Sequence, residues 1–457
     1  MSTEHAKKAA IFNKNREKTT WHDQTFWSVR MKHDAVAHQL PEWEDLRQHA
    51  SDIKRHTITH LADYLEAFTS NLESRGVIVH WANDADEFNA IVYDILKSHG
   101  VKKMVKSKSM LTEECQMNPY LIDRGIDVVE TDLGERIIQL LGQKPSHIVM
   151  PAIHLTREEV GRMFEEKGIS QEKGNYDPTY LTRCARHHLR EEFVEADAGM
   201  TGCNFGVAKT GDIVVCTNEG NADMTTSIPK LHIVSMGIEK LVPDYASLAV
   251  FQRLLCRCGT GQPTTTYTSH FRQARPGGEM HVVLVDNGRS KILGNPEHWE
   301  TLKCIRCGAC MNTCPVYRRS GGYSYSYFIP GPIGVNLGML HDARKHAGNV
   351  SACSLCLSCD NVCPAEVAPG SQIYVWRQML DSIGKADPLK KTMSKGMEAL
   401  FEAPTLYQTT LKFAPLANLI PERLTHFSRI NPWGIGHAKP EFAKKSFHQL
   451  WKEGEVK

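Results

Sequence analysis

Short apolar runs alternate with segments of helical periodicity after residue 74 of this chain. Residues 1–74 form a charged leader with a mostly helical pattern. The runs that follow have the length of strands, and the segments between them have the length and period of helices. This alternation predicts βαβ units, and therefore an α/β fold with a largely parallel, doubly wound sheet. The predicted strands are Gly76–Trp81, Lys103–Lys108, Asp127–Thr131 and His147–Pro151, and the predicted helices are Asp84–Lys97, Glu135–Leu141 and Thr156–Lys167.

A second set of apolar runs follows a predicted helix at Tyr180–Asp197. The polar turn Thr217–Asp223 begins where one of these runs ends. Open α/β sheets tend to bind ligands at such strand ends, so this turn marks a candidate pocket. The predicted strands are Phe205–Ala208, Ile213–Cys216, Leu231–Ser235 and Met280–Val285.

The basic turn Lys106–Ser109 ends another predicted strand. Its lysines and hydroxyls suit the binding of phosphate or carboxylate. The same turn could instead cap the next helix, with Ser109 or Thr112 as the N-cap. No local feature decides between the two interpretations.

The charge balance argues against some partners. The chain has 54 basic and 52 acidic residues, so it has no bias toward nucleic acid or anionic membranes. No stretch approaches the roughly 18 to 20 apolar residues of a transmembrane segment. Residues 1–20 are basic but lack the apolar core of a secretory signal. We therefore expect a cytoplasmic protein.

Eight of the 14 cysteines fall in two copies of one pattern. The copies are Cys304-x2-Cys307-x2-Cys310-x3-Cys314-Pro315 and Cys353-x2-Cys356-x2-Cys359-x3-Cys363-Pro364. This is the spacing of bacterial ferredoxins with two [4Fe-4S] clusters, in which the fourth cysteine of a run binds the other cluster. Two zinc sites explain the pattern less well, because structural zinc uses separate cysteine pairs. One cluster is therefore assigned to Cys304, Cys307, Cys310 and Cys363, and the other to Cys314, Cys353, Cys356 and Cys359.

The other six cysteines are scattered and suggest no disulfide framework, which agrees with a reducing compartment. Cys256 and Cys258 could form a third metal or redox element, but buried thiols at a helix end are the simpler interpretation. No G-x-G-x-x-G follows a strand, and no G-x4-G-K-[ST] occurs. A Rossmann site and a P-loop are therefore not expected.

The region between the two cysteine runs suits a mainly helical ferredoxin. It carries Tyr323, Tyr325 and Tyr327, which could shield the clusters from water. Gln372–Ile383 has the pattern of an amphipathic helix. Residues 386–457 contain several prolines and too little apolar pattern for a large core, so docking to a partner and wrapping around the chain's own domains both remain open.

The chain resembles the lactate-utilisation iron-sulfur proteins (LutB, also called LldF or YkgF) along nearly its whole length. Both cysteine runs and Gly331–Gly334 belong to the match. The other matching stretches are Val105–Ser109, Glu130–Gly134, Pro145–Val149, Pro151–His154, Thr217–Asn221, Met236–Lys240 and Leu284–Arg289.

The resemblance implies a LUD domain with a NagB/RpiA/CoA-transferase-like open sheet, followed by an all-α ferredoxin domain with two [4Fe-4S] clusters. We expect a leader packing on the LUD domain at 1–74, the LUD domain at 75–295, the ferredoxin domain at 296–385 and a C-terminal segment at 386–457. The family works with a CCG-type cysteine-rich protein (LutA-like) and a small LUD protein (LutC-like) in oxidising L-lactate to pyruvate. This chain would be the electron-transfer subunit of that NAD-independent complex. It would pass electrons to a quinone or carrier protein, and its partners could hold it at the inner face of the membrane.

One position departs from the family pattern. Lys209 stands where we expect a glutamate, and a protonated amine cannot act as a general base. No catalytic residue is therefore assigned. Two rival functions stay open, namely an enzyme that acts on a phosphorylated or CoA-linked substrate and a scaffold in which iron only stabilises the fold.

Overall fold

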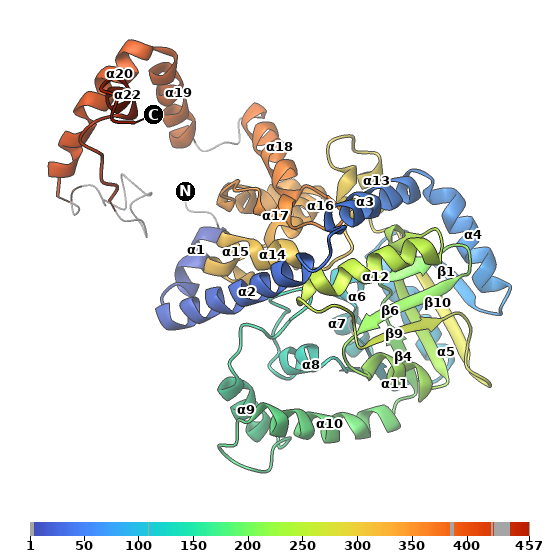
Figure 1. The fold of residues 1–457 in the computed structure, drawn as a ribbon. Coiled ribbons are helices and arrows are strands. Elements are labelled where there is room, and N and C mark those ends of the chain that lie inside the picture. Colours follow the sequence, from blue (N-terminus) through green and yellow to red (C-terminus); the bar gives the residue numbers. More distant parts are fainter. Residues whose placement is uncertain (1–3, 108, 384–387, 422–423, 425–438, 457) are drawn as a thin grey trace. The chain divides into compact units, whose positions relative to one another are not determined.

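The computed structural model describes residues 4–107, 109–383, 388–421, 424 and 439–456. They belong to two compact units, residues 1–378 and residues 379–457, and each unit is described by itself (Figure 1). Among the described helices, none is both long and apolar enough to cross a membrane.

The first unit contains an open sheet of six parallel strands, which confirms the predicted α/β region. Its strand order is β1-β10-β7-β4-β2-β3. The interior strands β7 and β10 are almost entirely buried, as expected for apolar runs covered on both faces. The strands are β1 Ile78–Ala82, β2 Lys103–Lys106, β3 Asp127–Glu130, β4 Ala198–Thr201, β7 Leu231–Gly237 and β10 Glu279–Val285.

Strand β4 was not predicted from the sequence. Its four residues include Ala198 and Gly199, which have low strand propensity. A Cβ atom on Gly199 would lie 1.8 Å from the carbonyl oxygen of Thr225, so glycine is needed where helix α11 (Asn221–Ser227) crosses the strand. Close packing of a helix, rather than strand propensity, therefore accounts for this position.

A second, smaller sheet has the order β8-β5-β6-β9. The apolar runs of the second set therefore do not stay together. Two of them form β5 and β6 here, whereas the other two enter the centre of the main sheet as β7 and β10. The strands are β5 Phe205–Val207, β6 Asp212–Thr217, β8 Leu241–Val242 and β9 Tyr267–Phe271.

The strand predicted at His147–Pro151 is wrong, because this segment is an irregular loop. The Nδ1 atom of His147 accepts hydrogen bonds from the backbone N–H groups of Val149 (3.1 Å) and Met150 (3.0 Å). The N–H of Ser146 also donates to the carbonyl of Pro151. These local bonds satisfy donors that a strand would have directed to a neighbour.

The helices of the α/β region begin at polar caps. Asp84, Asp132 and Asp177 each accept a backbone N–H three residues ahead, and Thr156 forms a capping box with Glu159. Four of these helices were predicted within a few residues of their ends. The helices are α5 Ala85–Ser98, α6 Met110–Glu114, α7 Met117–Ile122, α8 Leu133–Leu140, α9 Arg157–Glu166, α10 Pro178–Val194, α11 Asn221–Ser227, α12 Tyr245–Gly259 and α13 Arg289–Leu293, with η1 at Ile238–Lys240.

Residues 299–378 are helical and contain both cysteine runs. In Figure 1 this region lies beside the blue leader helices, with α2 against α14 and α15, and α3 against η2. The leader helices are α1 Glu4–Phe12, α2 Arg16–Ala37, α3 Trp43–Thr59 and α4 Leu61–Glu73. The others are η2 Trp299–Lys303, α14 Ala309–Thr313, α15 Pro315–Ser320, η3 Gly322–Ser324, α16 Gly331–Ala352, α17 Ser358–Asn361 and α18 Pro369–Ser382.

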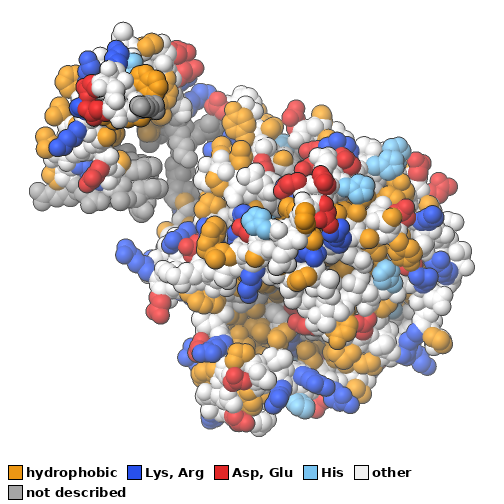
Figure 2. All heavy atoms as spheres, viewed as in Figure 1, with side chains coloured by type: hydrophobic (Ala, Val, Ile, Leu, Met, Phe, Trp, Pro, Cys, Tyr) orange, Lys and Arg blue, Asp and Glu red, His pale blue; other side chains and the backbone are white. Residues whose placement is uncertain are grey.

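The second unit contains short helices that bury few apolar side chains. Among its described residues, Phe401, Phe413, Leu419 and Trp451 are all more than half exposed. Figure 2 shows such hydrophobic side chains among charged ones on this unit. Its helices are α19 Pro388–Glu402, α20 Pro404–Phe413, η4 Ala414–Leu419 and α22 Phe447–Lys452. Residues 386–387, 422–423, 425–438 and 457 of the predicted C-terminal segment lie outside the described residues.

Candidate functional site

The two cysteine runs follow the same unusual backbone path. In each run the residues on both sides of the second cysteine have positive φ angles. Arg306 (62°) and Gly308 (83°) flank Cys307, and Leu355 (53°) and Leu357 (57°) flank Cys356. Three of these four residues are not glycine, and left-handed backbone at such residues costs free energy that the surrounding structure must offset. The repeated path indicates that both loops are shaped around the same kind of group.

The fourth cysteine of the second run lies with the first three of the first run. One small cavity between the two runs is lined by all four of these cysteines, namely Cys304, Cys307, Cys310 and Cys363. A second approach between the runs involves Cys314, the fourth cysteine of the first run. The thiols of Cys353 and Cys356 lie close enough to Cys314 to raise its pKa. Burial is the main cause of that shift, and together these effects raise the pKa of Cys314 to about 11. Iron must displace such protons, because thiolates are the ligands of iron-sulfur clusters.

Backbone N–H groups point at four of these sulfurs. The N–H of Arg306 lies 3.4 Å from Cys304 Sγ, and that of Leu355 lies 3.3 Å from Cys353 Sγ. The remaining pairs are Tyr317 N with Cys314 Sγ (3.5 Å) and Val367 N with Cys363 Sγ (3.3 Å). Donors of this kind stabilise negative charge on sulfur and tune the reduction potential of a cluster.

Of the three predicted tyrosines, Tyr325 is buried, Tyr327 is partly buried and Tyr323 is exposed. Tyr325 is 7% exposed, and the Cys314 thiol is among the groups that raise its pKa above the usual value, after burial. The pKa of Tyr327 is also raised by burial. Tyr323 is 43% exposed, and its hydroxyl donates to the Lys144 carbonyl. Tyr325 is therefore the tyrosine of this set best placed to shield Cys314 and Cys353 from water.

The leader helices hold the cysteine runs by polar contacts. Arg47 Nε donates to the Cys363 carbonyl at 3.0 Å, and Arg30 donates to the Thr313 hydroxyl at 2.6 Å. The His22 ring lies 2.8 Å from the Arg318 carbonyl. The leader thus contacts the helical region as well as the α/β region.

A cavity of about 370 Å³ lies where the main sheet meets the first cysteine run. The predicted turn supplies part of its wall through Thr217, Asn218, Glu219, Asn221 and Ala222. The first cysteine run contributes Arg306 and Cys307, which no sequence pattern placed near the turn. The candidate pocket and the first set of cysteines therefore share a wall.

Sequence profiles of three known families match this chain in succession. The LUD domain matches residues 65–291, the 4Fe-4S dicluster domain matches residues 300–367, and the C-terminal domain of lactate utilisation protein B matches residues 375–456. A lactate utilization protein B from Oceanobacillus iheyensis is 40% identical over 91% of this chain and 89% of its own length. Another from Bacillus pumilus is 42% identical over 89% of this chain and 86% of its own length.

The chain belongs to the lactate utilization protein B family. Its 4Fe-4S dicluster domain implies two [4Fe-4S] clusters, and the eight cysteines supply the right number of thiolates for them. A solved structure, that of a DUF162 family protein from Deinococcus radiodurans, aligns with 49% of this chain and 98% of its own at 14% identity and a TM-score of 0.28. That score is too low to describe the fold.

In this family member, Lys106 does not supply a cation to the pocket. Its side chain is 1% exposed and forms an ion pair with Glu130, itself 2% exposed, at 2.7 Å. Burial alone would lower the pKa of Lys106, but the carboxylates of Glu130 and Glu113 keep it above its usual value. Ser107 and Ser109 do line the cavity, whereas Lys108 lies outside the described residues. Ser109 is the N-cap residue of α6, but its hydroxyl bonds to Ser235 instead of the helix.

Replacing Lys106 with methionine should lower the free energy of unfolding by about 3 kcal/mol, because it leaves the Glu130 carboxylate buried without a cation. Urea unfolding followed by circular dichroism measures this loss. The double variant Lys106→Met/Glu130→Gln is the control and should recover part of the stability. If Lys106→Met is as stable as the wild type, the ion pair does not have the structural role assigned here.

Lys209 lies outside the pocket altogether. It is an exposed residue in the turn between β5 and β6, and it does not line the cavity. The carboxylates in the cavity wall come instead from Glu114, Asp132, Glu219 and Glu239. The departure from the family pattern at Lys209 therefore has no bearing on the charge of the pocket.

Cys256 and Cys258 are both buried near the end of α12, which agrees with the simpler interpretation of these thiols. Cys256 lines the pocket, and Cys258 forms a side-chain hydrogen bond with Cys307.

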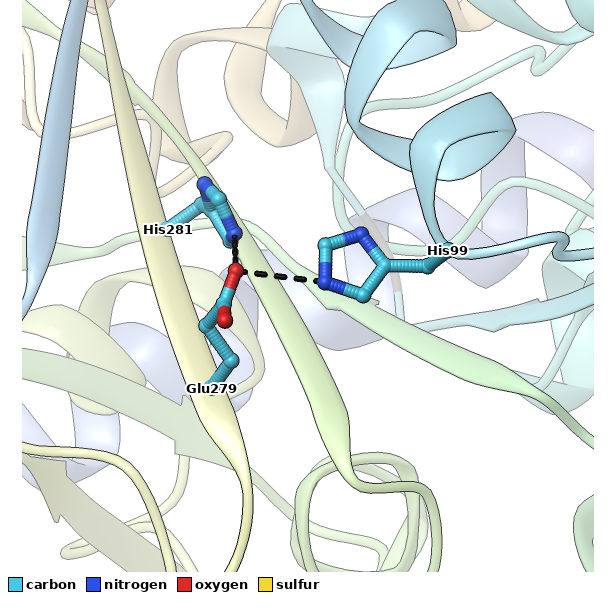
Figure 3. Close-up of side chains that lie close together, drawn as sticks. All are labelled: His99, Glu279 and His281. Atoms are coloured by element: carbon cyan, nitrogen blue, oxygen red, sulfur yellow. Dashed lines mark hydrogen bonds and ion pairs between the residues drawn. The ribbon is translucent and has the colours of Figure 1, made fainter.

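A separate group of His99, Glu279 and His281 has the chemistry of a metal site (Figure 3). Glu279 Oε1 bridges the two rings, at 3.2 Å from His99 Nε2 and 2.6 Å from His281 Nε2. The other ring nitrogen of His281 lies 2.9 Å from His80 Nε2. These contacts among the side chains explain why the three residues lie close together, and no metal ion is needed to hold them there.

Proposed function

We propose that this chain is the iron-sulfur electron-transfer subunit of a multi-subunit complex that oxidises L-lactate to pyruvate. The observation that carries the proposal is the convergence of Cys363 with Cys304, Cys307 and Cys310 on one cavity. A crossed arrangement of this kind holds two clusters close together, which is what a relay needs and a zinc scaffold does not. Lactate enters the proposal through the names of the relatives.

The first cluster is assigned to Cys304, Cys307, Cys310 and Cys363, and the second to Cys314, Cys353, Cys356 and Cys359. The shared cavity supports the first assignment. The Cys353 and Cys356 thiols lie near enough to Cys314 to raise its pKa, and this proximity supports the second assignment. For Cys359, burial, Asp360 and the thiols of both Cys310 and Cys314 raise the pKa, so its assignment rests on the cysteine spacing.

Oxidation of lactate to pyruvate releases two electrons and two protons. A [4Fe-4S] cluster accepts one electron at a time, so two adjacent clusters could relay both electrons to a quinone or carrier protein. The chain's own part is to hold the clusters and to shield them, through N–H···S bonds and buried tyrosines. The CCG-type protein and the small LUD protein are the proposed companions.

The finer structural expectations are part of this proposal. The α/β region is taken to be NagB/RpiA/CoA-transferase-like, with domain limits at 74/75, 295/296 and 385/386. The protein is proposed to work in the cytoplasm, held at the inner face of the membrane by its partners.

The test is lactate-dependent bleaching of the cluster absorbance in the reconstituted three-protein complex under anaerobic conditions. We expect bleaching with L-lactate when the companions are present, and none when the CCG-type protein is omitted. Variants with alanine at the ligand cysteines are the control and should not bleach. Turnover of a phosphorylated or CoA-linked substrate by the isolated chain, unchanged in those variants, would instead support the rival enzyme.

A further inference from the structure

The pocket and the first set of cysteines are separated by very little protein. Ile148 and Cys307 line both the 370 Å³ cavity and the smaller cavity around Cys304, Cys310 and Cys363. A molecule in the larger cavity would therefore lie next to a ligand of the first cluster.

The positive charge of Arg289 in the pocket wall is already neutralised. Its guanidinium makes two bonds to Glu114, at 2.9 and 3.0 Å, and one to Glu239 at 2.6 Å. The other acidic side chains of the wall also have partners. Asp132 caps helix α8, and Glu219 accepts from the Leu133 N–H.

Two other cations of the wall, Lys240 and Arg306, act on Glu239 from a distance but form no ion pair with it, and Arg289 already bonds that carboxylate. Within the described part of the chain, no carboxylate lies within the 4 Å of an ion pair with Lys240 or Arg306. The Arg306 Nη1 atom is buried and has no hydrogen-bond partner among the described residues. Both side chains are partly buried. Removing cations from water without a bonded anion is costly, so a pair of them facing one cavity favours an anionic occupant.

Neutral donors complete the wall on the side of the sheet. The Ser107 side chain is 3% exposed, and its hydroxyl has no partner among the described residues. The hydroxyls of Ser109 and Ser235 lie 2.9 Å apart, and the Ser235 hydroxyl can donate to the Thr201 carbonyl, so these two serines bond to each other and to the backbone. Apolar side chains such as Leu111, Val149 and Leu255 fill the space between the polar groups.

We propose that this cavity binds a small 2-hydroxy or 2-oxo carboxylate, with its carboxylate at Lys240 and Arg306 and its second oxygen at the Ser107 hydroxyl. The inference rests on the proposed function and deepens it, because it places the binding site for the electron donor or its product within this chain. The cavity volume lies at the lower end of the range for small-molecule sites.

The position of the two cations also couples the ligand to the first cluster. Arg306 lies in the chain between the ligand cysteines Cys304 and Cys307, and it lines the larger cavity together with Lys240 and Cys307. A carboxylate that neutralises these cations makes an additional electron on the cluster less favourable. By linkage, the carboxylate must then bind the oxidised protein more tightly than the reduced protein.

The test is calorimetric titration of oxamate, a carboxylate that cannot be oxidised in the way of lactate, into the full chain with both clusters oxidised. We expect saturable binding at one site and at least about tenfold weaker binding to Lys240→Gln, which loses a charge-assisted hydrogen bond. Lys209→Gln is the matched control, since that lysine is exposed in the same α/β region, and its affinity should be unchanged. Iron content and visible circular dichroism check that the clusters of each variant are intact.

Two further measurements keep the test decisive if Lys240→Gln fails to fold. Ser107→Ala should weaken binding by about fivefold, and reduction with dithionite should weaken binding to the wild type by at least about fivefold.

Absence of saturable binding to the wild type, or equal affinities in both redox states and in the folded pocket variants, overturns the proposal. If oxamate does not bind but lactate still bleaches the clusters of the reconstituted complex, only this pocket proposal fails. If oxamate binds but lactate never bleaches the clusters, only the proposed lactate relay fails.

Discussion

Replacing Cys363 with alanine should remove the same cluster that is lost from Cys304→Ala, although the two residues lie in different cysteine runs. The cavity shared by Cys304, Cys307, Cys310 and Cys363 is the reason. Conversely, Cys314→Ala should remove the cluster that is lost from Cys353→Ala. Each variant should retain about four iron atoms per chain in place of about eight, because one cubane loses a ligand and the other keeps all four.

The two clusters can be told apart by EPR of the dithionite-reduced protein, recorded for the four variants beside iron analysis. The control is Cys184→Ala, because Cys184 packs at the edge of a distant core around Met163 and Phe164 and should leave both signals intact. An uncrossed arrangement would give the opposite pairing, in which Cys363→Ala and Cys353→Ala lose the same signal. That pairing would contradict the ligand assignment while leaving two clusters in place.

Much of the α/β region could be predicted because its elements have local causes. The helices from Asp84, Asp132 and Thr156 begin at capping side chains, and their apolar periodicity is regular. The exceptions arise where tertiary contacts override the pattern. His147 captures the backbone donors of an apolar run, and Gly199 becomes part of a strand because a helix packs closely on it.

The candidate site was predictable only where a motif carries its geometry. The cysteine spacing predicts a crossed pair of clusters, and the turn at Thr217 correctly marks the edge of a cavity. The lysine at 106 shows the limit of such reasoning, because only the fold reveals that Glu130 neutralises it. Arg306 and Lys240 were missed for the same reason. The one available signal was that Arg306 is a basic residue between two ligand cysteines. Nothing in the sequence brings it close to Lys240, which lies 66 residues earlier in the chain, in η1.

Arg289→Met should cost the most stability of the non-cysteine variants considered for this protein. The Arg289 side chain is 7% exposed and neutralises Glu114 and Glu239, which are 12% and 4% exposed. Without it, two buried carboxylates share a wall of the pocket with no cation bonded to them. Leaving a buried charge unpaired costs about 3 to 5 kcal/mol, and here we expect the upper end of that range at pH 7.

The loss should shrink as the pH falls from 7 to 5, and the signs of the pKa shifts give the reason. Burial alone would raise the pKa of Glu239, but Arg289 and other nearby cations lower it to about 2. In the wild type this carboxylate therefore stabilises the fold above a pH of about 4.5, and its contribution is lost only as the pH falls toward 2. In Arg289→Met, burial is no longer opposed by that guanidinium, so the folded-state pKa rises and protonation relieves the unpaired charge within the range from pH 7 to 5. Urea unfolding at pH 7, 6 and 5, with iron content checked at each pH, measures the change.

Arg157→Met is the control, because Arg157 is 64% exposed and its ion pair with Glu158 contributes little, so its effect should be small and independent of pH. A loss in Arg289→Met that is equally large at all three pH values would mean that the carboxylates stay charged and find other partners, which would contradict the role of Arg289 as their counter-ion.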